Sequence, residues 1–478
     1  MTNKANAAEP SDRLLEALAR FTVHVEVKLT PATEAAALSA MIDAMGVALG
    51  ALQHPSAVIA RRYAEQNRNP EGATLWGSNT RVNVEAAALA NGVPLRAYDF
   101  NDLYIGKTGG HPSDLIPGLL AVAQTRQSSG PEFLDAMVLG YEVAILLLDC
   151  IELDSAGWDY PNITAIAAAC AITRLMKLTE EQTRHALAIT VIPHLASDEV
   201  ESGELNVRGD LTMWKRFNGA DAIRHAVYSC TLANAGAEGA VRPFEGNHGF
   251  LSKLTADKQD LGTLYSALGA MEFKQRILDV TFKRWPVGSR GQSAIQSALE
   301  AAARVSNLST IEKVEIICDE PAFEHLVLKR VDPWNPISRE TADHSLPYIV
   351  GAAVLEGKVD ISTFDVEKVL SEDRQSFIRN KVTAVSSRDL NNEKASAFLC
   401  RVIITDSSGS TFTGEPKAPP GHRSNPFDKK TVEGKFMECA APSLGWEHAR
   451  DTLTWLQRVN ACSDMSSLAS ILDSTRFQ

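Results

Sequence analysis

The chain has 478 residues, of which 45% are hydrophobic, and it carries a formal net charge of −12 with an isoelectric point near 5.5. This length and apolar content suffice for two or three domains with sizeable cores. The acidic balance excludes a nucleic-acid backbone or an anionic membrane as the main partner, because both would repel the averaged surface.

The seven cysteines are dispersed and form no C-x-x-C pair, so neither a zinc ribbon nor a regular iron–sulfur signature is present. Such a set is typical of reduced thiols in a cytosolic protein. The N-terminal sequence "MTNKANAAEPSDRLLEALARF" contains acidic residues and no apolar signal-peptide core. The longest apolar runs, "VAILLL" and "AIAAACAI", are shorter than the roughly 20 residues that span a bilayer. We therefore expect a soluble, cytoplasmic protein without membrane partners.

Residues 11 to about 275 are rich in alanine and leucine at helical spacing. The clearest runs are "TEAAALSAMIDAMGVALGAL", "FLDAMVLGYEVAILLLDCI", "ITAIAAACAITRLMKL" and "ADAIRHAVYSCTLANAG". Helix start signals accompany them: Thr179 precedes Gln182 as a capping box, and Pro31 directly follows Thr30. This part of the chain is predicted to form a helical core.

From about residue 280 the pattern changes to β-like runs, namely "IEKVEIIC", "NKVTAVSS" and "AFLCRVIITDSSGSTFTGE". Helical spacing returns in "PFDKKTVEGKFMECA" and "DTLTWLQRVNACSDMSSLASIL" near the C-terminus. The predicted fold class is therefore mainly α with a smaller α+β domain. We expect a large all-helical domain from residues 1–279 and 416–478 and an α+β domain from residues 280–415.

The stretch "YDFNDLYIGKTGGHPSD", residues 98–114, places several polar groups on a glycine-rich connection after an apolar run. Its chemistry-bearing side chains are Asp99, Asn101, Asp102, Lys107, His111 and Asp114. A solvated loop is the simplest interpretation. The alternative is a site in which Ser113 or Asp114 caps the next helix and His111 lies at the mouth of a helix N-terminus. Anions are favoured there and imidazole exchanges protons near neutral pH, so this placement suits a carboxylate substrate.

Four more stretches follow "DFNDLY…GHPSD" in the sequence: "LTMWKRFNGADAIRHAVYSCTLANAGAEG", "PFEGNHGFL", "FKRWPVGSRGQSAIQSALE" and "RETADHSLPYIVGAAVLEGKV". Together the five resemble the MmgE/PrpD family in order and spacing, from about residue 15 to 460. The family includes 2-methylcitrate dehydratase, cis-aconitate decarboxylase and an iminodisuccinate epimerase. The resemblance implies a helical domain from both chain ends, an α+β lid domain, a homodimer, and an active site in the cleft between the domains.

Matched residue by residue, the family's catalytic histidine falls on His111 and the acidic residue before it on Asp99. The helical-domain lysine falls on Lys215, the lid lysine on Lys283, and the tyrosine of the "SLPY" motif on Tyr348. The resemblance implies a di- or tricarboxylate substrate, for which the two lysines would supply charge-assisted hydrogen bonds. His111, oriented by Asp99, is expected to act as the acid or base, since its pKa lies near operating pH.

Five further residues are candidates for substrate binding: Arg290, His344, Asp102, Lys107 and Tyr160. Arg290 follows Lys283 closely in the sequence and would add a third cation to the two lysines. Either Tyr348 or His344 is expected to donate the second proton. Tyr348 lies four residues after His344, so we expect both on one helical face, in a shared pocket or as a core pair.

Each of these residues also has a structural interpretation. Lys215 alone is typical of a surface lysine, Lys283 and Arg290 of the basic edge of a connection, and His344 of a helix cap. A solvated loop is the default expectation for the acidic segment "SDEVESGEL", and its position before Lys215 leaves a place near the cleft as the alternative. Its carboxylates are Asp198, Glu199, Glu201 and Glu204.

Three positions depart from the pattern of the family. Leu103 stands where many relatives have threonine, and its apolar side chain cannot donate a hydrogen bond. Tyr160 stands where dehydratase-like members tend to have histidine, and Arg290 where several others have it.

We expect a lyase of the type used in propionate catabolism, which dehydrates 2-methylcitrate or a similar 2-hydroxy polycarboxylate with no metal and no cofactor. Leu103 and Arg290 favour instead a cis-aconitate-type decarboxylase or an epimerase acting α to a carboxylate. A third hypothesis is a catalytically silent dimer. The joint presence of five polar groups argues against it, because a silent scaffold has no physical need for all of them in a cleft: Asp99, His111, Lys215, Lys283 and Tyr348.

Overall fold

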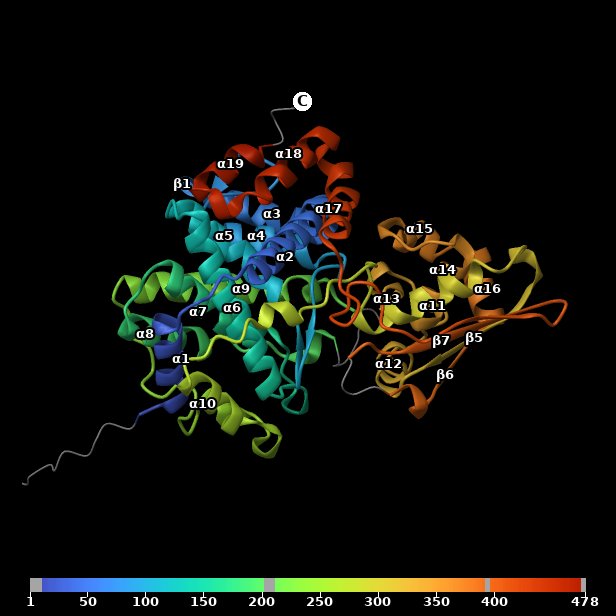
Figure 1. The fold of residues 1–478 in the computed structure, drawn as a ribbon, viewed down its shortest axis with the longest axis horizontal. Coiled ribbons are helices and arrows are strands. Elements are labelled where there is room, and N and C mark those ends of the chain that lie inside the picture. The colour runs from blue at the N-terminus through green and yellow to red at the C-terminus, as the bar shows by residue number, and fades with distance from the viewer. Residues whose placement is uncertain (1–10, 202–210, 392–395, 474–478) are drawn as a thin grey trace, which may run out of the picture.

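The chain forms a large helical part and a smaller part with a four-stranded sheet (Figure 1). The computed structural model describes residues 11–201, 211–391 and 396–473. Each part has its own hydrophobic core, and we call the helical part the body and the smaller part the lid. The predicted fold class, mainly α with a smaller α+β domain, is confirmed.

The helices of the body come from both ends of the chain. Its first segment contains α1 (Arg13–His24), α2 (Pro31–Gly50), α3 (Pro55–Ala64), α4 (Val84–Arg96), α5 (Ile116–Thr125), α6 (Gly130–Cys150), α7 (Pro161–Leu175), α8 (Glu180–Val191), α9 (Asn218–Asn234) and α10 (Leu261–Gly269). Its C-terminal segment contains α17 (Lys429–Leu444), α18 (Trp446–Leu456) and α19 (Leu468–Ile471). Two short antiparallel pairs lie among them, β1 (Arg68–Thr74) with β2 (Arg81–Val82) and β3 (Tyr104–Ile105) with β4 (Gly109–Gly110).

Local sequence sets where several of these helices begin. The Thr179 hydroxyl accepts the backbone N–H of Gln182, whose side chain returns to the backbone of Thr179, so the predicted capping box starts α8. Thr30 caps α2, with Pro31 as its first residue. The helix cap predicted at Ser113 or Asp114 is absent, because α5 has Leu115 as its N-cap residue, without a side-chain cap hydrogen bond.

A buried ion pair joins the two chain ends within the body. The Lys435 ammonium of α17 lies 2.6 Å from the Asp43 carboxylate of α2, and the two side chains are 1% and 0% exposed. Lys435 also donates to the carbonyl of Phe100 at 2.8 Å. The ion pair between α2 and α17 therefore also fixes the loop that follows α4, through the carbonyl of Phe100.

Helix α2 is the only helix of the described residues that is long and apolar enough to cross a membrane. The search of the sequence for long apolar runs did not identify this helix as a candidate membrane span, because its hydrophobicity comes largely from alanine. Inside the body 67% of its apolar window is buried, as in the core helix of a folded domain.

The lid sheet has the strand order β6-β5-β7-β8. Its strands are β5 (Ile311–Cys318), β6 (Val382–Ser386), β7 (Cys400–Asp406) and β8 (Thr411–Gly414). Strands β5 and β6 run parallel and the other neighbours antiparallel, and these strands fall on the three predicted β-like runs. The lid helices are α11 (Gln292–Ala302), α12 (Glu320–Phe323), α13 (Arg339–Ala342), α14 (Leu346–Glu356), α15 (Val366–Val369) and α16 (Glu372–Lys381). Helices α11 and α14 pack against the sheet and complete the lid core.

The two chain segments that link body and lid are hydrogen-bonded to each other and to the body. Leu103 and Thr281 exchange both backbone hydrogen bonds, at 2.8 and 2.9 Å. Phe282 then donates its N–H to the carbonyl of Gly421 at 2.9 Å. Gly421 has a φ of +89°, and a Cβ there would lie 2.1 Å from the carbonyl oxygen of Phe282, so only glycine fits. This junction places the start of the lid beside the glycine-rich stretch of the body.

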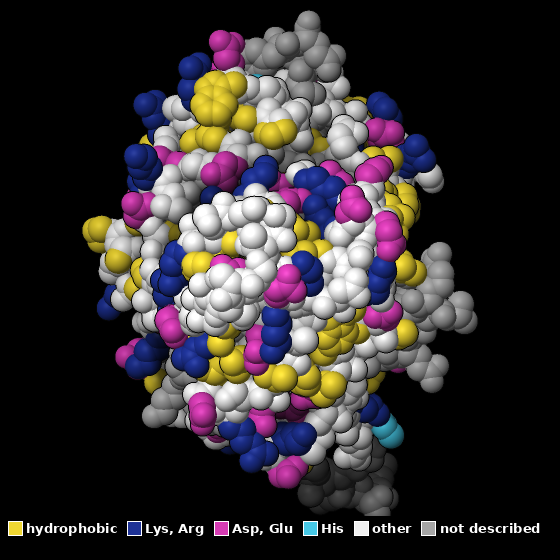
Figure 2. Space-filling model, turned by 90° about the vertical axis from the view of Figure 1, so that its right-hand side faces the viewer, with side chains coloured by type: hydrophobic (Ala, Val, Ile, Leu, Met, Phe, Trp, Pro, Cys, Tyr) yellow, Lys and Arg dark blue, Asp and Glu magenta, His cyan; other side chains and the backbone are white. Residues whose placement is uncertain are grey.

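The outer face of the lid carries Lys and Arg interspersed with Asp and Glu, and its hydrophobic atoms lie in small patches (Figure 2). Neither sign of charge gathers there into an extended tract. That face therefore has no charge pattern that would attract one class of charged ligand.

The Asp43–Lys435 pair predicts a specific stability cost. Lys435→Met should lower the free energy of unfolding by about 3–5 kcal/mol, because it leaves the Asp43 carboxylate buried without a counter-charge. The double variant Asp43→Leu/Lys435→Met should lose less than Lys435→Met alone. Urea unfolding measures both values, and a double variant less stable than the single one would contradict this account.

Candidate active site

A cavity of about 290 Å³ lies between the body and the lid. All the residues predicted to form a site line it except Tyr348 and Asp102. The polar side chains that matter below are Asp99, His111, Tyr160, Glu201, Lys215, Lys283, Arg290, His325 and His344. The structure thus brings together residues from widely separated parts of the chain.

A larger groove, of about 720 Å³, lies on the body. Its cations already bind carboxylates, since Arg174 lies 2.8 Å from Asp135 and Lys177 lies 2.6 Å from Glu132. The groove therefore offers no cation that is free to bind an anionic ligand, and the interdomain cavity is the candidate site.

Asp99 lies at the centre of the site, in the loop after α4, with a φ of +46°. Its Oδ1 accepts from Lys283 Nζ at 2.8 Å and from Arg96 Nη1 at 3.1 Å, and its backbone carbonyl accepts from Lys283 at 2.9 Å. Burial alone would raise the pKa of Asp99, but Lys283 and Arg96 outweigh burial and hold the pKa well below its usual value. Asp99 is therefore ionised and fixed between one cation of the body and one at the start of the lid.

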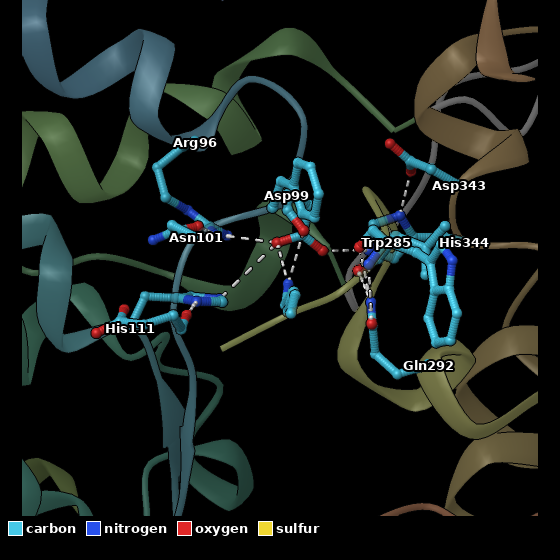
Figure 3. A network of polar contacts seen from close by, with 12 residues as sticks. Arg96, Asp99, Asn101, His111, Trp285, Gln292, Asp343 and His344 are labelled. Carbon is cyan, nitrogen blue, oxygen red and sulfur yellow. Dashed lines mark hydrogen bonds and ion pairs between the residues drawn. The ribbon is translucent and has the colours of Figure 1, made fainter. Parts of the chain in front are cut away.

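His111 holds its proton on the nitrogen that faces the protein. Its Nδ1 lies 2.5 Å from the backbone carbonyl of Asp102, and since a carbonyl only accepts, Nδ1 is the donor. Its Nε2 lies 4.0 Å from Asp99 Oδ1 and faces the cavity (Figure 3). Burial, together with the cations Arg96 and Lys283, holds the pKa of His111 well below its usual value. A neutral imidazole with a free Nε2 is a general base.

Asp102 supports this histidine through its backbone rather than through its carboxylate. Its carboxylate accepts from the backbone N–H and the hydroxyl of Ser113 and from the hydroxyl of Tyr141, at 3.1, 2.5 and 2.9 Å. Burial raises the pKa of Asp102 to about 7. The side chain of Asp102 lies behind His111 and does not line the cavity, so the structure does not place it as a ligand for substrate.

His344 lies on the other side of Asp99, with Nε2 3.6 Å from Asp99 Oδ2 (Figure 3). Its Nδ1 donates to Asp343 at 2.5 Å, and Asp343 is held by Arg216 at 2.9 Å. Its Nε2 lies 2.9 Å from Lys215 Nζ and must accept, because an ammonium only donates. Burial, followed by the Lys215 charge, lowers the pKa of His344, so this histidine is also neutral.

Glu201 joins the site although the sequence predicts it in a solvated loop. Its Oε1 lies 2.8 Å from Lys215 Nζ and 2.9 Å from His325 Nε2. Burial would raise the pKa of Glu201, but Lys215 and His325 hold it well below the usual value. For Glu201 the default of a solvated loop is therefore wrong and the alternative, a place at the cleft, is confirmed, while Glu204 lies outside the described residues.

Arg290 lines the cavity from the lid, with its guanidinium 5.0 Å from the ring centroid of Phe398. Within the described parts of the chain it has no ion-pair partner within 4 Å, and its Nε is buried without a hydrogen bond. Such a guanidinium matches a carboxylate ligand. Lys107 lies at the exposed mouth, where its ammonium donates to the carbonyl of Lys258 at 3.2 Å.

Tyr160 packs its ring against His111, and its hydroxyl binds the protein instead of pointing into the cavity. Its ring lies edge-on to His111, with centroids 5.2 Å apart. Its hydroxyl donates to Asp114 Oδ2 at 2.8 Å. Tyr160 and Asp114 thus hold the imidazole of His111 in position, and neither carries a free donor toward the cavity.

Tyr348 does not reach the cavity. It is 0% exposed in the lid core, where its hydroxyl donates to the carbonyl of Thr363 at 3.0 Å and accepts from Arg374 at 2.9 Å. The expected common helical face with His344 is absent, because α14 begins at Leu346 and His344 precedes it. The structure therefore separates the two candidates for the second proton.

Within the described residues no group of three or more His, Cys, Asp or Glu side chains is arranged to hold a metal ion. Leu103 lines the cavity where a threonine would bring a hydroxyl, so this side chain supplies no hydrogen-bond donor. The polar chemistry of the site therefore rests on its histidines, lysines, arginine and carboxylates.

Comparison with known proteins matches two family models to this chain. The MmgE/PrpD N-terminal domain matches residues 16–261, and the MmgE/PrpD C-terminal domain matches residues 285–460. Human cis-aconitate decarboxylase is 24% identical over 438 residues, which cover 87% of this chain and 85% of the relative. The 2-methylcitrate dehydratase of Salmonella typhimurium is 22% identical over 439 residues, 86% of each chain. The alkylcitrate dehydratase phiI of Talaromyces stipitatus is 23% identical over 461 residues, 89% of this chain and 90% of the relative.

The depressed pKa of His111 predicts the acid limb of activity. Because the base must be neutral, kcat/KM should fall only below about pH 6.5, the usual histidine range. Lys283→Met removes a cation that lowers the pKa of His111. The acid limb of the residual activity should therefore move to higher pH. Lys358→Met removes a cation that pairs with Asp360 on the lid surface, outside the cavity lining, and should leave the acid limb where it is. A limb that does not move in Lys283→Met would contradict the assignment.

The position of Tyr348 predicts a structural and not a catalytic effect. Tyr348→Phe should lower the free energy of unfolding by about 1–2 kcal/mol, because the Thr363 carbonyl and Arg374 lose a buried partner. Steady-state kinetics should show kcat/KM within about threefold of the unmodified protein. A loss of turnover at unchanged stability would show that Tyr348 acts in the reaction.

Proposed function

The chain belongs to the MmgE/PrpD family, and we propose that it is a lyase that dehydrates 2-methylcitrate or a similar 2-hydroxy polycarboxylate in this cleft. The reaction in this proposal uses acid and base side chains, with no metal and no cofactor. One observation carries it: the neutral His111 presents its free Nε2 to a cavity that also contains lysines and an arginine.

The cations of the cavity supply the carboxylate contacts. Lys283 donates two hydrogen bonds to Asp99. Within the described residues its third N–H has no partner, so it can bind a ligand. Arg290 can present its fork of donors to a second carboxylate. A substrate held between them would lie beside His111, since Lys283 and His111 approach the same oxygen of Asp99.

The base then starts the elimination. His111 Nε2 takes the proton from the carbon next to a carboxylate, and the electron pair of that C–H bond delocalises into the carboxylate as enolate-like charge. Lys283 lies where this charge develops and stabilises it. The C–C double bond forms as the C–O bond breaks, and the hydroxyl leaves as water when it receives a second proton. Tyr348 and the neutral His344 cannot give that proton directly, because the hydroxyl of one and the Nδ1–H of the other bind protein acceptors.

A cis-aconitate-type decarboxylase or an epimerase acting α to a carboxylate is the alternative function. Leu103 favours it, because the wall where many relatives place a hydroxyl has no donor for a departing hydroxyl group. Human cis-aconitate decarboxylase is also among the relatives that match most of the chain. The same base and cations would serve either reaction, since both pass through charge next to a carboxylate.

We further propose a cytoplasmic homodimer, as the family resemblance implies. Light scattering of the purified protein should give twice the 51.8 kDa of one chain. The mass of a single chain would contradict the dimer without bearing on the chemistry of the cleft.

Proton NMR in D₂O tests the reaction. The protein should be incubated with 2-methylcitrate, citrate, cis-aconitate and an aspartate-derived imine, beside a His111→Gln control that cannot accept the proton. New vinyl signals from a hydroxy acid, absent in the control, are the expected result. Itaconate-like signals from cis-aconitate, or deuterium exchange without net change, would support the alternative. No reaction with any of the four compounds would contradict both functions for these substrates and would favour the catalytically silent dimer.

A further inference from the structure

Lys215 lies on the wall of the cavity across from the base. Its Nζ is 2.9 Å from Nε2 of His344, and His344 lies on the opposite side of Asp99 from His111 (Figure 3). Its side chain is 6% exposed and lines the cavity. Lys283, in contrast, lies beside the base. The two lysines therefore occupy different sides of the site.

The ammonium of Lys215 is tied to the protein by two bonds, to His344 and to Glu201. Glu201 belongs to the body, and it also binds His325 of the lid at 2.9 Å. His344 is fixed in turn by Asp343 at 2.5 Å. An ammonium has three N–H donors. Within the described residues two of those of Lys215 are used, so one remains for a ligand.

The other polar groups of the cavity are poor donors for the second proton. The Tyr160 hydroxyl is bound to Asp114. Lys283 binds the same oxygen of Asp99 that His111 approaches, so its ammonium lies on the side of the base. Burial raises the pKa of Asp159 to about 8, so this carboxyl holds a proton near neutral pH, but the Tyr160 N–H and the Asn218 amide engage both its oxygens within the body, at 2.7 Å each. Arg290 keeps its proton at all working pH values. Lys215 remains as the donor that faces the base across the cavity.

We propose that Lys215 gives the second proton and that Glu201 is a positioning residue that keeps its ammonium on the wall. This inference rests on the proposed dehydration. The hydroxyl of the substrate takes a proton from Lys215 Nζ as the C–O bond breaks, and it leaves as water. After the product departs, His111 releases to solvent the proton taken from carbon, and solvent returns a proton to Lys215. Lys283 and Arg290 bind the carboxylates.

The role of Glu201 follows from competition for one cation. A carboxylate 2.8 Å from Lys215 already satisfies much of its charge, so the substrate carboxylate gains little from the same ammonium. Without Glu201 the freed ammonium would bind that carboxylate, which tightens ground-state binding and removes the proton donor from the leaving hydroxyl. Interactions that favour the ground state in this way lower kcat.

Glu201→Gln tests the proposal, because it keeps the acceptor oxygen and removes the charge. Calorimetry with propane-1,2,3-tricarboxylate, an unreactive ligand, should show binding about 3–10-fold tighter than in the unmodified protein. The kcat of the reaction that the unmodified protein catalyses should fall at least about tenfold, since a general acid contributes about 10²–10⁴-fold. Tighter binding with slower turnover is a split that a damaged fold would not produce.

Two further variants separate charge from position. Asp154→Asn removes the same charge from the exposed rim of the cavity, where no step of the mechanism uses it. It should leave kcat near normal and tighten binding by less than about twofold. Glu201→Asp keeps the charge on a shorter side chain, so binding should stay within about twofold of normal while kcat falls.

Weaker binding together with lower kcat in Glu201→Gln would overturn the proposal, as would two unchanged values. The binding measurement also distinguishes this inference from the proposed function. If the protein dehydrates no hydroxy acid, binding still decides the role of Glu201: a gain in Glu201→Gln beyond that of Asp154→Asn supports it, and no gain overturns it.

Discussion

The buried carboxylate of Asp99 is the contact on which the rest of the site depends. It accepts from Arg96 of the body and from Lys283 at the start of the lid, and its φ of +46° turns it to meet both. Removal of either cation would leave a buried charge short of a partner, at a cost of several kcal/mol. The ion pairs therefore fix the geometry of the cleft and the charges that surround its histidines.

Two histidines face this carboxylate, and their partners give them different roles. His111 and His344 both carry their proton on Nδ1, because Nδ1 faces the carbonyl of Asp102 in one and the carboxylate of Asp343 in the other. They differ at Nε2, which is open to the cavity in His111 and accepts from Lys215 in His344. One is thus free to take a proton, while the other can only orient the lysine beside it.

The sequence predicted the fold class and the members of the site that belong to recognisable motifs. His111, Lys283 and Arg290 meet in the cleft as their motifs indicated. Tyr348 is the exception among these motifs, because the "SLPY" stretch does not reveal that the Tyr348 hydroxyl binds Thr363 and Arg374 inside the lid core. The common helical face expected with His344 also failed, since α14 begins at Leu346. The default expectation also failed for Glu201, whose partner His325 is 124 residues away, since an acidic run shows no sign of a partner so remote. Pairing across the cleft is a property of the tertiary fold and has no local sequence pattern.

The protonation state of His111 tests the central claim most directly. Nitrogen NMR of protein labelled at histidine, with the His111 signals assigned from His111→Gln, reports the proton on each ring nitrogen between pH 5 and 8. The account predicts a neutral ring with its proton on Nδ1 throughout most of this range, because burial and the neighbouring cations lower its pKa. A protonated imidazolium at pH 7, or a neutral ring with its proton on Nε2, would contradict it.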